Sequence, residues 1–422
     1  MIQSSSFSFQ KRWRLLTQGW QGVDWMLMLL PIALVGFATV VISSIQRNLA
    51  LHDLSWNHAV LGLISTAIAL WLARVRYEYL LQWQWIIYAV TNISLIVVMF
   101  IGTIGSGAQS WINVGGFYVQ PSEFAKVGII ITLAANLSSR NSSSLLGVGR
   151  ALAITAVPWA LVFIQPDLGT SLVFGAITLG MLYWADVNPG WLLLMVSPLV
   201  AAIVFHFSVP IWLIWSGMMG IIAWMTLPWR LLSTVIATAI NLVAGKVGQI
   251  FWGLLHDYQK DRLILFLDPD KDPLGGGYHL IQSRIAIGAG ELWGRGLGEG
   301  TQTQLSFIPE QHTDFVFSAV GEEWGFLGAI ALLIVFWLIC LRLVIIAQNA
   351  KDNFGSLLVV GILSMILFQV GVNIGMTIGL APITGIPLPW VSYGRSSMLT
   401  NFIALGIAES VANYRHRLKF TD

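Results

Sequence analysis

The strongest constraint on this chain is a series of apolar runs, each long enough to cross a lipid bilayer. Of its 422 residues, 56% are hydrophobic and only 10% are charged. Soluble domains carry roughly 25% charged residues, so this composition indicates a fold whose main solvent is lipid. A helix needs about 20 apolar residues to span the hydrocarbon core. We therefore predict an all-α fold, a polytopic integral membrane helical bundle.

About twelve spans are expected, nine before a long polar stretch and three after it. They cover residues 25–43, 58–73, 85–103, 122–137, 149–164, 169–185, 191–207, 211–227, 231–252, 315–343, 356–378 and 398–411. Lys11, Arg12 and Arg14 precede the first run, and no small-residue cleavage pattern follows it. That run therefore reads as a retained first helix rather than as a cleaved signal.

Lys and Arg are unevenly distributed between the loops on the two sides of these spans. With the N-terminus inside, the inner loops receive Arg74, Arg76, Arg140, Arg150, Arg230, Arg342 and Lys351. The short outer loops receive only Arg47 and Arg395. Because cytoplasmic loops are enriched in Lys and Arg, we expect cytoplasmic tails at 1–24 and 412–422. The polar stretch 255–313 is then an extracytoplasmic loop.

Two classes of site are excluded by composition. A formal net charge of +2 gives no case for nucleic-acid binding. The single cysteine, Cys340, rules out an internal disulfide and any cysteine-based metal site.

The polar loop 255–313 is expected to be ordered, because apolar and aromatic side chains are spread along it. Within it, residues 279–289 can form a short helix with Leu280, Ile281, Ile285 and Gly288 toward one side. Such a helix would either lie in the membrane interface or fold back against the bundle. Long loops in compact chains are usually functional or disordered, so this loop is the first place to look for chemistry.

The densest acidic motif of this loop is Asp268-Pro-Asp-Lys-Asp-Pro-Leu-Gly-Gly-Gly-Tyr278. Asp-Pro and a run of glycines are typical of a turn, and a plain turn is one interpretation. The other is a carboxylate held near the membrane surface as a general base or cation ligand. Glycines beside it would let the backbone approach a substrate closely.

A second polar cluster, residues 308–315, lies just before a spanning run. Thr313 is predicted to cap the helix that begins there, because a hydroxyl can accept from free backbone amides. Glu310 and His312 are not needed for capping and remain open to a functional role.

A third cluster, residues 109–126, ends inside the fourth predicted span. Gln120 or Ser122 can cap that helix. Glu123 and Lys126 are three residues apart, so they share a face and can neutralise each other. Ionisable groups at membrane depth also favour a functional role, because each is costly unless it faces a polar cavity. Trp111 is most simply an interfacial anchor.

Three further features are single residues or short segments. Asp167 lies in a short turn between two predicted spans, where capping the second helix is the commoner role. Pro382, Pro387 and Pro389 interrupt the chain before the last span and indicate a broken or re-entrant segment. Lys246 falls inside a predicted span, where it either snorkels or is paired.

At these positions the chain resembles the SEDS family (shape, elongation, division and sporulation), the integral-membrane peptidoglycan polymerases. The matching motifs are Trp111-Ile-Asn-Val-Gly, Gln120-Pro-Ser-Glu-Phe-Ala-Lys126, Gln165-Pro-Asp-Leu-Gly-Thr170, Asp272-Pro-Leu-Gly-Gly-Gly-Tyr278, Ile281-Gln-Ser283, Ala286-Ile-Gly288, Pro309-Glu-Gln-His-Thr-Asp-Phe315, Gly321-Glu-Glu323 and Pro387-Leu-Pro-Trp-Val-Ser-Tyr-Gly394. They follow the family's order over nearly the whole chain. Residues 256–259 and 300–309 look like the elongation branch (RodA) rather than the division branch (FtsW).

The resemblance implies a single SEDS-type membrane domain, 1–422, that acts as a peptidoglycan glycosyltransferase. Such an enzyme polymerises lipid II on the outer face of the cytoplasmic membrane and releases undecaprenyl diphosphate. The family's catalytic loop aspartate corresponds to Asp272, as general base. The substrate-binding candidates are Trp111, Glu123, Lys126, Arg284, Arg295, Glu310 and His312. No cofactor is required, a divalent cation (Mg or Mn) is compatible, and the implied protein partner is a class B penicillin-binding protein.

The chain departs from the family pattern in three places. Ser110 stands where the family has a basic residue, which removes one candidate for holding the diphosphate. Arg395 stands where the family has a second glycine. Residues 191–252 have room for three spans where the family's ten-helix plan has one, so we predict an inserted helical hairpin there.

Two other functions remain open at this stage. A flippase for the lipid-linked precursor would need many spans, a broken segment and an intramembrane ion pair. A non-enzymatic scaffold that recruits the transpeptidase would need only the partner-binding surface. The long acidic loop favours chemistry at the outer face.

Overall fold

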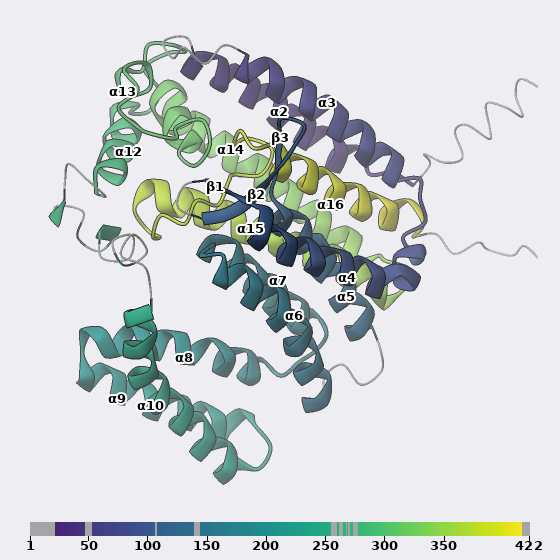
Figure 1. Cartoon of the computed structure of the whole chain (residues 1–422), viewed down its shortest axis with the longest axis vertical. Coiled ribbons are helices and arrows are strands. Elements are labelled where there is room, and N and C mark those ends of the chain that lie inside the picture. Colours follow the sequence, from purple (N-terminus) through teal and green to yellow (C-terminus); the bar gives the residue numbers. More distant parts are fainter. Residues whose placement is uncertain are drawn as a thin grey trace, which may run out of the picture.

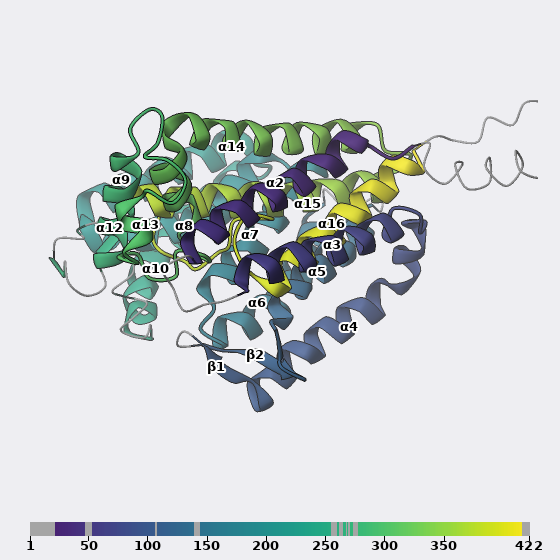
Figure 2. The same cartoon turned by 90° about the horizontal axis from the view of Figure 1, so that it is seen from above.

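The computed structural model describes residues 22–46, 53–105, 108–138, 144–254, 260, 265–266, 268, 271–272 and 277–415. Helices dominate it, and most run side by side in one bundle (Figure 1, Figure 2). The helices are α2 (Trp25–Ile45), α3 (Leu54–Leu72), α4 (Glu78–Ile101), α5 (Pro121–Leu137), α6 (Leu145–Ile164), α7 (Leu168–Trp184), α8 (Pro189–Phe207), α9 (Val209–Thr226), α10 (Arg230–Leu254), α12 (Tyr278–Ala289), α13 (Thr301–Gln304), α14 (Val316–Gln348), α15 (Asn353–Ile378) and α16 (Arg395–Asn413).

Each of the twelve expected spans coincides with one of these helices. Among the described residues, nine helices are long and apolar enough to cross a membrane. The other three are α5 and α7, with 17 residues each, and α16, which is less apolar. The prediction of a polytopic, mostly α-helical membrane protein is therefore confirmed.

A small antiparallel sheet was not expected from the sequence. Its strands are β1 (Thr103–Gly105), β2 (Ala108–Val114) and β3 (Phe117–Val119), in the order β1-β2-β3. Gly115 and Gly116 join β2 to β3, with φ of 59° and 88°. Two successive residues of positive φ make the tight hairpin turn that glycines favour. The purely α-helical prediction is wrong for this segment, although its Gly-Gly turn is a hairpin signal.

The bundle has two ends, which we name by what they carry. At the terminal end the Gly22 amide donates to Asn413 Oδ1 (3.1 Å), so the start of the described chain lies beside the end of α16. There Arg342 pairs with Asp24, whose backbone amide donates to Glu409 Oε2 (2.9 Å). The opposite end, the loop end, carries the sheet, α12 and α13 (Figure 1).

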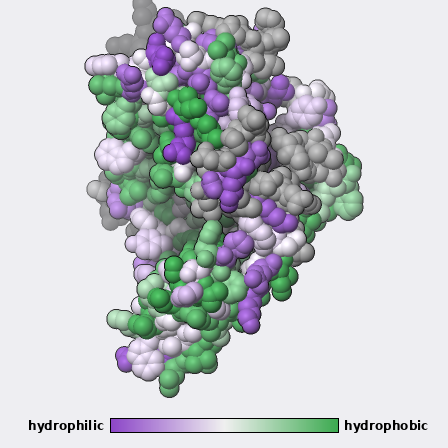
Figure 3. Space-filling model, turned by 90° about the vertical axis from the view of Figure 1, so that its left-hand side faces the viewer, coloured by the Kyte–Doolittle hydropathy of each residue, from purple (hydrophilic) through white to green (hydrophobic). Residues whose placement is uncertain are grey.

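Helices α8, α9 and α10 pack chiefly on one another and form a unit beside the bundle (Figure 1). A polar seam runs through it: Trp212 Nε1 donates to the Asn241 carbonyl (3.1 Å), and Asn241 Nδ2 donates to Ser197 Oγ (3.0 Å). Its surface is largely hydrophobic in the view of the loop end (Figure 3). Lys246 is exposed on α10. The three helices expected within 191–252 are therefore all present.

The interior of the bundle is built around α5 and α15, which neighbouring helices cover. Most residues of both helices are buried, whereas α3, α4 and α8–α10 expose many apolar side chains. This arrangement explains how α5, the shortest and most polar of the first four helices, can lie within the membrane region. Its charged residues face other helices instead of lipid.

Candidate active site

Asp272 lies on the approach to α12 and is exposed. Its backbone carbonyl accepts from the Gly277 amide (3.0 Å), immediately before α12 begins. Asp268 is partly exposed, and its carboxylate lies 3.8 Å from Lys271 Nζ. The structure thus shows Asp272 as a solvent-facing carboxylate near the start of an ordered helix. Asp270, Pro273 and the glycines 275–276 of the motif lie outside the described residues.

Helix α12 confirms the predicted short helix and folds back against α14 and α15. Its buried face consists of Leu280, Ser283 and Ala286. Ser283 Oγ contacts Ser318 Oγ (2.6 Å) and donates to the Thr377 carbonyl (2.7 Å). The predicted contact face was wrong in part, because hydroxyl bonding at Ser283 sets the orientation and leaves Ile285 exposed.

Glu123 and Lys126 form a buried ion pair in the first turns of α5. Lys126 Nζ lies 2.7 Å from Glu123 Oε2, and the side chains are 1% and 4% exposed. The three-residue spacing correctly predicted that the charges of Glu123 and Lys126 neutralise each other. A fully buried ion pair is a weak source of stability, since desolvation offsets the attraction, so its presence invites a functional explanation.

Asp167 joins the start of α5 to the start of α7. Its carboxylate accepts from the Thr170 amide (3.0 Å) and hydroxyl (2.9 Å), which confirms the predicted cap of α7. Gln120 Nε2 (3.2 Å) and Ser122 Oγ (3.4 Å) donate to the same carboxylate. Neither Gln120 nor Ser122 caps α5 through its side chain, so that prediction was wrong. Both side chains instead bind Asp167.

The sheet lies against this cluster. Trp111 is half-buried on β2, where it pairs with Thr103 of β1, and the adjacent Ser110 is buried. Arg395 Nη1 donates to the Gly116 carbonyl (3.4 Å), which connects α16 to the β2–β3 turn. Two of the three departures from the family pattern, Ser110 and Arg395, therefore lie on one small layer formed by the sheet and the start of α16.

Glu310 and His312 lie in the turns before α14. Thr313 donates its hydroxyl to Glu310, at the carbonyl (3.1 Å) and at the carboxylate (3.0 Å). The predicted Thr313 cap is wrong, because α14 begins at Val316 after Phe315, without a side-chain cap. The His312 carbonyl accepts from the Tyr393 amide (2.9 Å), and burial lowers the His312 pKa, with the nearby Glu310 charge opposing that shift.

Arg284 and Arg295 are exposed on and after α12. Arg295 Nε donates to the Ala289 carbonyl at the end of that helix (3.0 Å), so its guanidinium has a structural partner. Arg284 lies beside Gly379, at the start of the segment between α15 and α16. Of the predicted cations, Arg284 is thus exposed at the loop end, whereas Lys126 is enclosed.

The candidate residues fall into two groups. Asp272, Arg284, Arg295, Glu310 and His312 lie on or near the α12–α14 loop, and Trp111, Glu123 and Lys126 lie on the sheet and α5. The segment between α15 and α16, which contains Pro382, Pro387 and Pro389, contacts the first group and the start of α7. Tyr393 bonds His312, while the Thr384 carbonyl lies against Gly169 of α7. The irregular, non-helical course predicted for this segment is confirmed.

Glu322, which the sequence offered only as part of a motif, holds the loop in place. Its buried carboxylate accepts from the amides of Gln302 (2.8 Å) and Thr303 (2.8 Å), at the start of α13. The sequence signal for this role was the pair of adjacent acidic residues inside an apolar run, because a buried carboxylate needs hydrogen-bond donors such as these amides.

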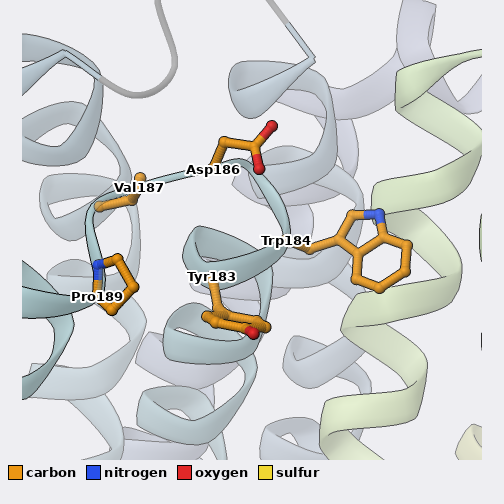
Figure 4. A pocket seen from close by; sticks show the side chains of 5 residues that line it. All are labelled: Tyr183, Trp184, Asp186, Val187 and Pro189. Atoms are coloured by element: carbon orange, nitrogen blue, oxygen red, sulfur yellow. The ribbon is translucent and has the colours of Figure 1, made fainter.

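A separate cavity of about 460 Å³ opens at the turn between α7 and α8 (Figure 4). It is lined by Tyr183, Trp184, Asp186, Val187 and Pro189. Helix α7 begins at the loop end and finishes here, so the cavity lies at the terminal end, away from both groups. Among the described residues, no group of three or more His, Cys, Asp or Glu side chains is placed to hold a metal ion.

Comparison with known proteins places these features in a family. The family model described as "Cell cycle protein" (FtsW, RodA and SpoVE) matches residues 23–216 and 208–417. The chain belongs to this family. The SEDS family is thus confirmed as the origin of the motif series, and its members supply the appropriate comparisons for the site.

Curated relatives of this SEDS chain include enzymes of known class. "Peptidoglycan glycosyltransferase MrdB" of Escherichia coli (strain K12) is 34% identical over 395 residues, covering 93% of this chain and 94% of its own. "Peptidoglycan glycosyltransferase RodA" of Treponema pallidum (strain Nichols) is 34% identical over 429 residues, covering 93% and 98%. These names agree with the predicted enzyme class, a glycosyltransferase.

Solved structures agree with the fold. A chain of a peptidoglycan synthase complex that coordinates polymerisation and crosslinking has a TM-score of 0.72 and 26% identity. The match covers 94% of this SEDS chain and all of that one. The rod shape determining protein RodA of Thermus thermophilus has a TM-score of 0.63 and 24% identity, covering 94% and 99%.

Proposed function

We propose that this SEDS protein polymerises lipid II into glycan strands on the outer face of the cytoplasmic membrane during cell elongation, with Asp272 as the general base. The observation that carries the proposal is an exposed carboxylate on a loop whose helix α12 is fixed to α14 and α15. The relatives named peptidoglycan glycosyltransferase support the reaction class.

The proposed sidedness places the loop end outside and both chain ends in the cytoplasm. Two independent observations support it. Lys and Arg are concentrated in the loops at the terminal end, as expected for cytoplasmic loops. Gly22 and Asn413 are hydrogen-bonded to each other at that same end, so both chain ends lie on the same side of the membrane.

The proposed reaction is an inverting glycosyl transfer. The acceptor sugar hydroxyl attacks the anomeric carbon of the donor, the bond to the undecaprenyl diphosphate oxygen breaks, and the hydroxyl proton passes to the Asp272 carboxylate. A carboxylate within hydrogen-bond reach of the hydroxyl is competent for this step. Exposure of Asp272 leaves it accessible to an acceptor strand that arrives from the water side.

The leaving diphosphate requires positive charge. Arg284 is exposed on α12, and Arg295 is partly occupied by its bond to Ala289. Lys126 is enclosed by its ion pair with Glu123, so it would act on the substrate only after the pair opens. A divalent cation would be held by Asp272 together with substrate phosphate oxygens, as Mg²⁺ commonly is.

We further propose that a class B penicillin-binding protein is the partner, which the similarity to a solved peptidoglycan synthase complex supports. Residues 191–252 are proposed to contain a helical hairpin added to the ten-helix plan. The family match divides at 208–216, inside the α8–α10 unit, and this division supports an insertion there.

The function is tested with the purified chain and its partner in nanodiscs that contain lipid II. Glycan strands resolved on a gel, with or without added Mg²⁺ or Mn²⁺, are the expected result. A parallel assay follows dye-labelled lipid II across vesicle membranes. Precursor crossing without glycan formation would overturn the proposal in favour of a flippase, and neither activity would favour a scaffold.

A further inference from the structure

Helix α14 is interrupted at Gly325, whose φ of 63° and ψ of −163° are not helical. A break of this kind leaves amides and carbonyls without their usual intrahelical partners. Segment 291–296, which follows α12, supplies the missing partners through four backbone hydrogen bonds. They run from Arg295 to Glu322 (2.9 Å), from Gly296 to Glu323 (3.1 Å), from Phe326 to Glu291 (2.9 Å) and from Leu327 to Leu292 (3.2 Å), amide to carbonyl in each case.

Glycine is required where the segment meets the helix. A Cβ at Gly325 would lie 2.2 Å from the Gly294 amide nitrogen, and a Cβ at Gly294 would lie 2.2 Å from the Glu323 carbonyl oxygen. Both residues also have positive φ. The backbone of segment 291–296 therefore packs directly against the backbone of α14, with no side chain between them at the two glycines.

The neighbouring helix α2 gives the depth of this junction. The Trp324 ring packs edge-on against Phe37 at 5.3 Å between centroids. Phe37 lies roughly 20 Å along α2 from Asp24, at 1.5 Å per residue. We take the charged pair of Asp24, immediately before α2, and Arg342 as the membrane boundary at the terminal end. Since the hydrocarbon core is about 30 Å thick, the break lies inside the leaflet at the loop end.

The surface at this depth is apolar. Helix α14 exposes a stripe at helical spacing, formed by Phe326, Leu327, Ile330, Leu333, Ile334 and Trp337. Leu292 joins the end of this stripe, because its carbonyl is bonded to Leu327, and Leu292 is 49% exposed. Trp293, the next residue, is 78% exposed. The stripe of a spanning helix thus continues onto Leu292 and Trp293, with the exposed charged residues Glu291 and Arg295 on either side of them.

We propose that segment 291–296 is a re-entrant segment immersed in the loop-end leaflet, with Leu292 and Trp293 in contact with lipid. Non-helical backbone is tolerated at membrane depth only where its polar groups are bonded within the protein, and α14 meets that need. Tryptophan favours the membrane–water boundary. Lipid is the occupant because the patch extends the lipid-facing stripe of a spanning helix.

The consequence is that the loop bearing Asp272 is anchored to the leaflet surface. Helix α12 ends at Ala289, directly before the immersed segment, so the depth of the segment fixes the depth of that helix. This inference does not rest on the proposed reaction. It would stand if the chain bound lipid II without polymerising it.

The test uses the single cysteine of the chain. In a Cys340→Ser background, Trp293→Cys is labelled with an environment-sensitive fluorophore and reconstituted into nanodiscs of phosphatidylcholine and phosphatidylglycerol. Two matched positions serve as controls: Ile334→Cys, near the middle of the stripe, and Glu299→Cys, which is exposed beyond the junction. Quenching is measured with nitroxide-labelled lipids and with aqueous iodide, on samples that elute as single species.

The label at position 293 is expected to emit at shorter wavelength than that at 299, and to be quenched several-fold more by shallow nitroxide lipids than by iodide. The label at 334 should respond best to nitroxide placed deep in the acyl chain. Iodide quenching at 293 equal to that at 299 would overturn the proposal. Protection of 293 from both quenchers would also overturn it, because a protein would then cover the patch.

Discussion

Replacing Lys126 by methionine tests whether the buried ion pair of α5 has a function beyond packing. The change leaves the Glu123 carboxylate, 4% exposed, without the ammonium 2.7 Å away. Removing one partner of a buried ion pair costs about 3–5 kcal/mol, because the remaining charge has lost both water and its counter-charge. We therefore expect Lys126→Met to unfold at a markedly lower temperature in detergent, followed by tryptophan fluorescence.

The double variant Glu123→Gln with Lys126→Met separates stability from activity. Neutral side chains of similar volume often replace a buried pair at little cost, so most of the lost stability should return. Glycan formation from lipid II should remain low if Lys126 contacts the diphosphate after the pair opens. A double variant that recovers both stability and full polymerisation would refute a functional role for the pair. A single variant as stable as the unmodified chain would refute the electrostatic reasoning itself.

Three further perturbations act on other parts of the site. Asp167→Ala removes the α7 cap, worth typically about 1 kcal/mol, and also frees the Gln120 and Ser122 donors. The melting temperature should therefore fall, and an effect no larger than that of Glu299→Ala would contradict this account. Burial lowers the His312 pKa below its ordinary 6.5, so the unfolded chain takes up this proton first as pH falls. The free energy of unfolding should thus decrease below about pH 6.5 more steeply than in His312→Gln, and equal slopes would contradict the assignment. Gly325→Ala puts a residue with a side chain into a backbone conformation that costs about 1–3 kcal/mol. It also places the new Cβ against the Gly294 amide nitrogen. Gly371→Ala, where a Cβ meets nothing within 4 Å, is the matched control and should be no less stable.

The spans could be predicted because each depends on a local property, the length of an apolar run. The same holds for α12 and for the Asp167 cap, since both follow from residues adjacent in sequence. The ion pair of α5 followed from its three-residue spacing, while the sidedness inferred from Lys and Arg remains a prediction. These features need no knowledge of what packs against them.

The features that sequence reasoning missed depend on distant partners. Thr313 has the side chain of a cap, yet its hydroxyl is taken by Glu310, and α14 begins two residues later than that cap would require. The buried side of α12 is set by Ser283, which finds partners on α14 and α15. The re-entrant junction is visible only once Gly325 and segment 291–296 are seen together.

The most direct test of the central claim is glycan synthesis by Asp272→Ala beside the matched variant Asp268→Ala. Asp272 is exposed and Asp268 is partly exposed in the same loop, and the Asp268 carboxylate lies 3.8 Å from Lys271 Nζ. Each variant would be purified with the partner protein, given lipid II, and its products resolved by length on a gel. We expect Asp272→Ala to yield no glycan while Asp268→Ala yields strands of normal length. Normal strands from Asp272→Ala would contradict the assignment of the general base.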